Sequence, residues 1–170
     1  DSNLKVKTNA SAFLSFIILP AMLLGEDIDL SNFSVSKKLL SSVDKIQATY
    51  YGWFTELDLK KIKITNDRSE VVQSRDDVVA AFFTGGVDSF DTVINTDENT
   101  KDSKIQKLLY VYGYDIRIGD EDLFQKTQEH LDKAANDLNK DIVYILTNLR
   151  EFTEKLLSWD FIHGAALAAT

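Results

Sequence analysis

The residues best suited to chemistry form one short loop, Thr84-Gly-Gly-Val-Asp-Ser89. Its two glycines let the backbone approach a ligand closely, and a helix that begins beside them points its first N–H groups at that ligand. The hydroxyls of Thr84 and Ser89 and the carboxylate of Asp88 add polar groups. This combination is typical of a phosphate-binding loop. The alternative interpretation is an ordinary tight turn in which Asp88 or Ser89 caps the helix.

The segments that flank the loop have the pattern of a strand and a helix. Val78 to Phe83 is a continuous apolar run, which is typical of a parallel strand buried on both faces. A helix is predicted from Asp88 or Ser89 to about Asn95, and a polar loop from there to Lys104. No Gly-Lys-Ser/Thr follows the glycines, which excludes a Walker loop.

Two more buried strands are predicted, Ile105 to Tyr112 and Ile142 to Thr147, with a helix from Asp120 or Glu121 to about Asn139 between them. Strands that alternate with helices predict βαβ units and a parallel sheet, so the fold class is α/β. Ligands of such sheets bind at the carboxyl ends of the strands. We expect those ends at Thr84–Gly86, Tyr112–Asp115 and Thr147–Arg150.

The first part of the chain has a different pattern, and we predict a small α+β region over residues 1–75. Ala12 to Leu24 is apolar but too short to span a bilayer. Pro20 favours a strand or short helix before it and a new helical turn after it, ended by Gly25. The further elements expected are a strand in Glu26–Leu30, a helix over Ser36–Tyr51 capped by Ser34 or Ser36 and closed by Gly52, an amphipathic strand in Leu57–Ile64, and a polar loop over residues 66–75.

The composition limits the function. The chain has no cysteine, which excludes disulfides, thiolate metal sites and cysteine nucleophiles, and fits a reducing compartment; we therefore predict a cytoplasmic protein. Its two histidines leave a zinc site with few ligands, and His130 is expected to face solvent. A net charge of −8 argues against general nucleic-acid binding. No membrane segment is predicted.

The loop Thr84–Ser89 resembles the Ser-Gly-Gly-x-Asp-Ser signature of the PP-loop ATP pyrophosphatase superfamily, apart from Thr84, which keeps the hydroxyl of the usual serine. The chain also resembles a group of longer PP-loop proteins in further motifs: Leu19-Pro-Ala-Met22, Tyr112-Gly-Tyr-Asp-Ile116, Thr147-Asn-Leu-Arg150 and His163-Gly-Ala-Ala-Leu-Ala168. The resemblance implies a Rossmann-like sheet of the adenine nucleotide alpha hydrolase-like type. It implies a nucleotide-binding domain over residues 76–170 that lacks its last strands, so that a second copy or a partner chain could complete the sheet.

The resemblance also implies a reaction. PP-loop enzymes bind ATP with Mg²⁺, transfer AMP to a carboxylate, amide or carbonyl oxygen of an acceptor and release pyrophosphate, after which a nitrogen or sulfur donor often displaces AMP. The implied cofactors here are ATP and Mg²⁺, with a small-molecule acceptor as partner. The open alternatives are hydrolysis of ATP to AMP and pyrophosphate, and a non-catalytic nucleotide-binding or scaffold module.

The resemblance assigns roles to the loop residues. Asp88 and Ser89 would be catalytic, with Asp88 near Mg²⁺. The pyrophosphate would be held by the N–H groups of Gly85, Gly86 and Val87 and by the hydroxyls of Thr84 and Ser89.

Five residues outside the loop are further candidates. Tyr112 and Gly113 lie where adenine or ribose would bind in a fold of this type. Asp115 could bind a substrate or metal, Arg150 could clamp a phosphate or carboxylate with two hydrogen bonds, and His163 is expected just before a helix of small residues that approaches the sheet near the nucleotide. Each has a plain alternative: a core aromatic residue, a turn glycine, a solvated loop aspartate, a surface ion pair and a packed histidine, respectively.

Overall fold

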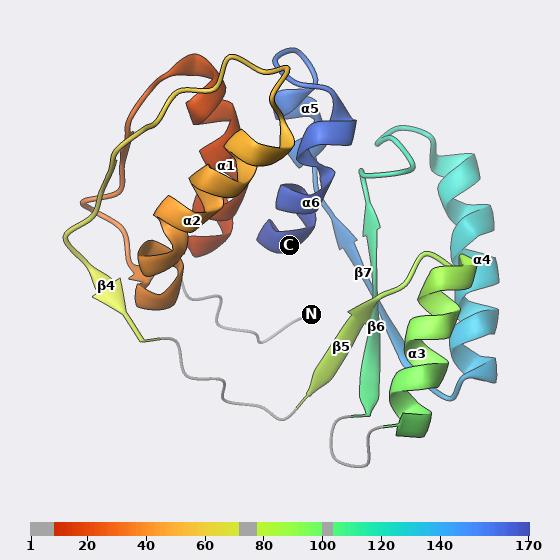
Figure 1. The fold of residues 1–170 in the computed structure, drawn as a ribbon. Helices are drawn as coiled ribbons and strands as arrows, with labels where there is room; N and C mark the ends of the chain where they lie inside the picture. The colour runs from red at the N-terminus through yellow and green to blue at the C-terminus, as the bar shows by residue number, and fades with distance from the viewer. Residues whose placement is uncertain (1–8, 72–77, 100–103) are drawn as a thin grey trace. The chain divides into compact units, whose positions relative to one another are not determined.

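The computed structural model describes residues 9–71, 78–99 and 104–170 (Figure 1). The chain divides into two compact units, one made of residues 1–73 and 151–170 and the other of residues 74–150. The first boundary lies close to the one predicted after residue 75. Residues 151–170 differ from the prediction, because they group with the N-terminal unit instead of the sheet. The reason is that helix α6 packs against helix α1.

The N-terminal unit combines helices with very short strands. Two pairs of strands are parallel, β1 with β3 and β2 with β4. The described elements of this unit are α1 (Ser11–Leu24), β1 (Ile28–Asp29), β2 (Val35–Ser36), α2 (Lys37–Trp53), β3 (Ile64–Thr65), β4 (Ser69–Glu70) and α6 (Trp159–Ala169). The mixture of helix and strand expected for the first part of the chain is therefore present.

Helix α1 runs without interruption through Pro20, so the predicted break there is wrong. A proline removes one N–H from a helix and normally weakens it. Here Leu19 and Met22, on either side of it, are fully buried, and this tertiary packing outweighs the local preference. Gly25 ends the helix as expected, in the left-handed conformation at φ 72°, and its N–H donates to the carbonyl of Ala21.

The strand predicted in Leu57–Ile64 is wrong for most of its length, since pairing occurs only at Ile64–Thr65. At Ile62 and Lys63, just before β3, the backbone N–H groups bond to side chains. The buried Gln47 side chain accepts the N–H of Ile62 at 2.9 Å and donates to its carbonyl at 3.2 Å. The N–H of Lys63 donates to Asp27 Oδ1 at 2.7 Å.

Helix α2 begins where the sequence predicted, because the Ser36 hydroxyl accepts the N–H of Leu39 at 3.4 Å. It continues through Gly52, so the predicted end at this glycine is wrong. The last turn is held by aromatic packing: Phe54, which caps the helix, stacks on Tyr50 with ring centroids 5.8 Å apart. Phe54 also meets Phe161 of α6 edge to face at 5.1 Å.

The second unit is an α/β unit with parallel strands, as predicted. Its sheet has the order β5-β6-β7, with Phe82 opposite Leu109 and Tyr112 opposite Leu146. Helices α3 and α4 lie on the same side of this sheet (Figure 1). The elements are β5 (Val79–Phe82), α3 (Val87–Asn99), β6 (Ile105–Tyr112), α4 (Glu121–Asp137) and β7 (Asp141–Leu146), followed at the unit boundary by α5 (Leu149–Thr153).

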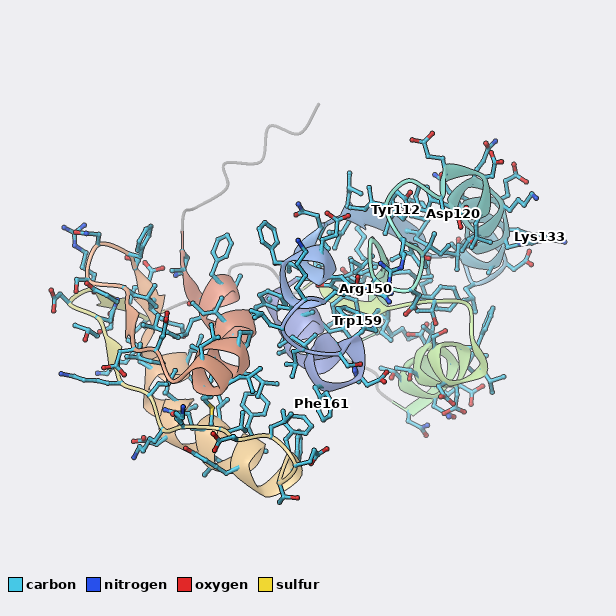
Figure 2. All side chains as sticks on the ribbon, turned by 90° about the horizontal axis from the view of Figure 1, so that it is seen from above. Tyr112, Asp120, Lys133, Arg150, Trp159 and Phe161 are labelled. Atoms are coloured by element: carbon cyan, nitrogen blue, oxygen red, sulfur yellow. The ribbon has the colours of Figure 1, made fainter. Side chains whose placement is uncertain are left out.

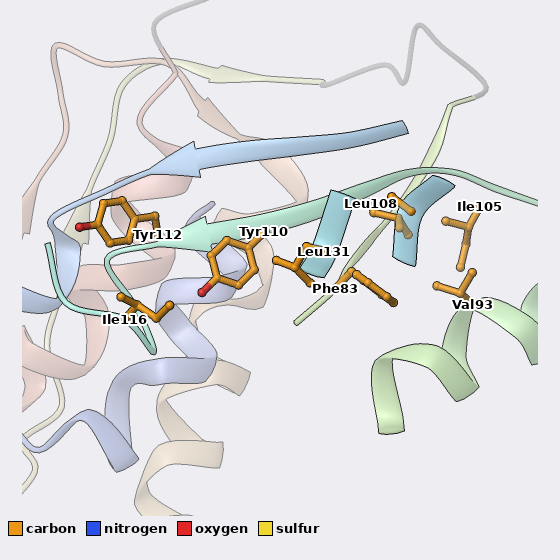
Figure 3. Close-up of a cluster of buried hydrophobic side chains, with 9 residues drawn as sticks. Phe83, Val93, Ile105, Leu108, Tyr110, Tyr112, Ile116 and Leu131 are labelled. Atoms are coloured by element: carbon orange, nitrogen blue, oxygen red, sulfur yellow. The ribbon is translucent and has the colours of Figure 1, made fainter. Parts of the chain in front are cut away.

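One hydrophobic cluster holds this unit together (Figure 3). Alternate residues of the strands face the two helices, and the cluster consists of Phe83, Val93, Ile105, Leu108, Tyr110, Tyr112, Ile116, Leu131 and Ala135. The prediction that the outer strands are buried on both faces is wrong. Phe82 in β5 and Val143 in β7 are 39% and 42% exposed, because α3 and α4 cover only one face.

Helix α3 extends to Asn99, so the loop predicted to begin at Asn95 is wrong for its first part. Residues 100–103 of that loop lie outside the described residues. Side-chain bonds hold the extra turn: the Asn99 side-chain amide donates to the carbonyl of Asn95 at 2.8 Å. Asp97 accepts the N–H of Ile105 at 3.1 Å and pairs with the ammonium group of Lys140.

Candidate functional site

The glycine loop is anchored at both ends by aromatic residues. Phe83 continues the pairing of β5 by donating its N–H to the carbonyl of Leu109 at 2.8 Å. Its side chain is fully buried and meets Phe90 of α3 edge to face, with ring centroids 5.0 Å apart. The loop between these two rings is exposed from Thr84 to Asp88. The sequence therefore folds into a fixed strand and a fixed helix joined by an accessible turn.

The backbone conformation and the surrounding space differ between the two glycines of the loop. Gly85 has φ 75°, and a β-carbon there would lie 3.1 Å from Leu131 Cδ2. Gly86 has no positive φ, and a β-carbon there would meet only Thr84 Oγ1, at 3.6 Å. The positive φ, together with the close approach of Leu131, favours a glycine at residue 85, whereas an alanine would fit at residue 86. Close approach of a ligand is the remaining reason for a glycine at residue 86.

Helix α3 begins at Val87, one residue earlier than predicted, so Asp88 and Ser89 lie inside its first turn. The Ser89 hydroxyl donates to the carbonyl of Gly86 at 2.8 Å, so it does not cap the helix by accepting an N–H. The exposed Asp88 carboxylate sits where a negative charge favours the helix dipole. The side chain of Val87 is 84% exposed and leaves the backbone around it open.

The three strand ends expected to meet lie at one edge of the sheet, because all three strands are parallel. Two of them are joined by hydrogen bonds. The N–H of Thr147 donates to the carbonyl of Tyr112 at 3.0 Å, and the Arg150 guanidinium donates to the carbonyl of Tyr114. Figure 2 labels Tyr112 and Arg150 in this region. Arg150 therefore ties the segment after β7 to the turn after β6. Its clamp on a phosphate or carboxylate stays a prediction.

Tyr112 and Gly113 both have structural roles. The Tyr112 ring is buried and stacks on Phe124 with centroids 4.1 Å apart, and its hydroxyl accepts the N–H of Gly119 at 3.0 Å. Gly113 has φ 108°, and a β-carbon there would lie 1.9 Å from the Thr147 carbonyl oxygen. These contacts support the core and turn interpretations. A contact of either residue with a nucleotide stays a prediction.

Asp115 is exposed and close to the aromatic core. Burial raises the pKa of Tyr110, and the negative charge of Asp115 raises it further. His163 lies inside α6 instead of before it, and α6 belongs to the N-terminal unit. Its Nδ1 lies 3.1 Å from the carbonyl oxygen of Asp160. A role of Asp115 or His163 in ligand binding stays a prediction. His130, in α4, is exposed as predicted.

The structure forms two grooves that were not predicted from the sequence. One, of about 440 Å³, lies between α2 and Lys61–Asn66 of the N-terminal unit. A larger groove of about 640 Å³ lies between α4 and the carboxyl ends of β6 and β7, lined by Tyr112, Phe124 and Tyr144. From the sequence, Tyr112 is a candidate contact for adenine or ribose, whereas Phe124 and Tyr144 are predicted only as parts of a helix and a strand.

Metal-binding groups are sparse. Across residues 9–71, 78–99 and 104–170, no cluster of three or more histidine or acidic side chains could hold a metal ion. Asp88 is thus a single carboxylate, which suits only a metal that takes its other ligands from water and a bound phosphate, as Mg²⁺ does. In the same part of the chain, no helix is both long and apolar enough to cross a membrane.

Fold and loop together define an α/β protein with a parallel sheet and a glycine turn at its carboxyl edge. Comparison with known proteins adds nothing to that class: no family model, no curated protein and no solved structure matches the chain.

Proposed function

We propose that the chain binds ATP with Mg²⁺ through residues 84–89 and transfers AMP to a small-molecule acceptor. The observation that carries this proposal is the exposed turn at Gly85 and Gly86, directly before helix α3 and at the carboxyl edge of a parallel sheet. Ligands bind at this edge in open α/β sheets. The proposal includes the finer fold type, a sheet of the adenine nucleotide alpha hydrolase-like kind.

The phosphate groups would contact the loop backbone. The first N–H groups of a helix have no partner within the helix, and together with the helix dipole they attract an anion. Val87 and Asp88 supply such N–H groups at the start of α3. Thr84, just before the turn, is exposed, and its Oγ1 lies 3.6 Å from the position of a β-carbon on Gly86. The Ser89 hydroxyl would bind phosphate only by giving up its bond to the carbonyl of Gly86.

The proposed reaction is a displacement at the α-phosphorus. An oxygen of the acceptor attacks that phosphorus, the bond from it to the bridging oxygen of the β-phosphate breaks, and pyrophosphate leaves with the electron pair. Backbone N–H groups aimed at the leaving group stabilise the charge that develops on it. Mg²⁺, held by phosphate oxygens, water and the Asp88 carboxylate, would neutralise part of the same charge.

One observation favours a second candidate, a nucleotide-binding module without catalysis. Asp88 is the acidic residue in the loop, and the Ser89 hydroxyl already has a partner within the loop.

A further strand from a second copy or a partner chain could add to the site by pairing with β5, which is an outer strand of the sheet in the described residues.

The test is to incubate the full chain with ATP and Mg²⁺, with and without a panel of carboxylate and amide acceptors, and to follow AMP and pyrophosphate by ³¹P NMR. Acceptor-dependent formation of AMP supports adenylation, whereas AMP without an acceptor indicates hydrolysis. ATP binding without turnover favours the non-catalytic module. If calorimetry detects no ATP binding, the proposal fails.

A matched pair of variants assigns the effect to the loop. Asp88→Asn should lower Mg²⁺-dependent binding or turnover, and Glu98→Gln, an exposed change in the same helix, should not. Equal effects of the two substitutions would argue against a role of Asp88 in Mg²⁺-dependent nucleotide binding.

A further inference from the structure

We propose that the groove between α4 and β7 is the acceptor site, and that it takes a small molecule with a flat apolar body and a neutral or positively charged polar group. Calling this ligand the acceptor rests on the proposed function. The existence of the site and its preference among ligands do not, since both follow from the shape and charge of the groove.

The groove has the size of a small-molecule site. Its volume is about 640 Å³, within the range of roughly 300–1,000 Å³ found for ligand pockets. It is shallow and widely open to solvent, and its lining is mainly apolar with a few polar side chains. Ile145 and Leu146, at the end of β7, form the strand side, and Leu146 is 66% exposed.

The aromatic side of the groove is held rigidly. Phe124 stacks on Tyr112 at 4.1 Å and meets Tyr144 edge to face at 6.0 Å. The hydroxyl of Tyr112 accepts the N–H of Gly119, and the hydroxyl of Tyr144 donates to Asp132 Oδ1 at 2.7 Å. A wall fixed in this way loses little conformational entropy when a flat apolar ligand packs on it.

The polar side of the groove carries one stripe of side chains from α4. Glu121, Gln125 and Gln128 are spaced by four and three residues, so they lie on the same face of the helix. Glu121 is the charged residue among those that line the groove, and no basic residue lines it. A cation or a neutral hydrogen-bonding group therefore matches this stripe, whereas a triphosphate would be repelled. The groove thus suits a ligand other than the nucleotide.

The groove lies at the same edge of the sheet as the glycine loop. Tyr112 pairs with Leu146 at the end of β6 and β7, and Phe82 of the adjacent strand leads into the loop. The loop strand β5 and the groove strand β7 flank β6, and at about 4.8 Å between neighbouring strands they lie roughly 10 Å apart. A small molecule in the groove could extend a reactive oxygen across that distance.

The experiment uses three probes with the same ring and different charge: tryptamine, indole and indole-3-acetate, each added to the full chain without ATP. Binding is followed by NMR through the side-chain amides of Gln125 and Gln128 and the methyl groups of Leu146. We expect saturable shifts at these groups, with affinity falling from tryptamine to indole to indole-3-acetate. Absence of saturable shifts, or tightest binding of indole-3-acetate, would overturn the proposal.

Matched variants locate the charge that matters. Glu121→Gln should weaken tryptamine binding about two- to fivefold, the range of an exposed ion pair. Asp122→Asn removes a neighbouring carboxylate from the same helix turn but not from the groove lining, so it should leave binding unchanged. Equal losses in the two variants would overturn the proposal, because the summed negative charge of the acidic residues at the start of α4 would then explain them.

A blocking variant separates this site from the loop. Gln125 is exposed, so Gln125→Trp should fold normally, which circular dichroism checks. It should abolish tryptamine binding and leave ATP binding unchanged, whereas Asp88→Asn should do the reverse. Tryptamine binding by a protein that does not bind ATP would refute the proposed function alone. If the Leu146 signals move with protein concentration instead of probe, the groove is an interface between two copies and the proposal is wrong.

Discussion

The carbonyl oxygen of Thr147 lies 1.9 Å from the position that a β-carbon on Gly113 would occupy. The ends of β6 and β7 come this close because Thr147 continues the pairing, donating its N–H to the carbonyl of Tyr112 at 3.0 Å. Gly113 then turns the chain at φ 108°, and its N–H donates to the carbonyl of Ile116 at 3.0 Å. The turn after β6 therefore has room for glycine and for no larger residue.

We predict that Gly113→Ala lowers the free energy of unfolding by about 3 kcal/mol, the sum of the left-handed backbone cost and an overlap with backbone atoms. The control is Gly119→Ala, at φ 100° with open space around it, which should cost only about 1–2 kcal/mol. Urea unfolding measures both. Similar losses for the two variants would mean that the contact with Thr147 does not exist.

Substitutions in the glycine loop should separate stability from binding. Gly86→Ala should change the free energy of unfolding by less than about 0.5 kcal/mol, because its β-carbon meets only Thr84 Oγ1 at 3.6 Å. It should weaken ATP binding about tenfold, corresponding to roughly 1.4 kcal/mol. Gly85→Ala should cost about 1–2 kcal/mol of stability through its positive φ. Unchanged ATP affinity in Gly86→Ala, measured by calorimetry, would argue against phosphate binding at this turn.

From the contact between Asp97 and Lys140 we predict that the free energy of unfolding falls at acidic pH. The hydrogen bond from Lys140 holds the pKa of Asp97 below its ordinary value. A carboxylate of this kind stabilises the fold above its unfolded pKa of about 3.9, and the stabilisation is lost as the pH falls through the lowered folded pKa. In Asp97→Asn the free energy of unfolding should therefore fall less steeply below about pH 4 than in the wild type. Glu98→Gln serves as the control, and an identical pH profile for the two variants would contradict the prediction.

For Tyr144 we predict a loss of stability in alkali, in contrast to the loss in acid expected for Asp97. Burial and the hydrogen bond to Asp132 raise the pKa of its phenol. The protonated phenol therefore contributes its full stabilisation below the ordinary pKa of about 10, and this is lost as the pH rises above it. Tyr144→Phe should remove this alkaline loss and cost about 1 kcal/mol at neutral pH. Urea unfolding between neutral and alkaline pH tests this, with Tyr51→Phe as an exposed control; a wild-type slope in Tyr144→Phe would refute it.

Gly52 offers a test of the N-terminal unit. It lies inside α2, and nothing lies within 4 Å of the position of a β-carbon there. Gly52→Ala should raise the free energy of unfolding by about 0.5–1 kcal/mol, because alanine favours helix over glycine. Thermal unfolding measures the change. Destabilisation would instead indicate that the helix ends at this glycine, as its sequence alone suggested.

The pattern of the sequence was sufficient for the elements of the second unit. Val78–Phe83, Ile105–Tyr112 and Ile142–Thr147 are short apolar runs bounded by turn residues, and each corresponds to a strand of the parallel sheet. The glycine loop was also predictable at its position between strand and helix. These features depend on residues that are near one another in the chain, which is why a reading of the chain in order finds them.

Other features depend on contacts between distant residues. Pro20 stays helical because its neighbours are buried, and the backbone at Ile62 bonds to Gln47 instead of a strand. The α4 groove needs Tyr112 from one strand end, Tyr144 from another strand and Phe124 from a helix. No local pattern shows these relationships.

By itself, the sequence determined the α/β class of the second unit and the place of the loop at residues 84–89, because hydrophobic period and glycine turns act locally. The tertiary structure alone decided at which residue of that loop the fold favours a glycine. A glycine is favoured at residue 85 by its φ of 75° and by the nearby Leu131, which lies far along the chain in α4, whereas Gly86 has space. That difference depends on how a strand and a helix pack across the turn, so it exists only in the folded chain.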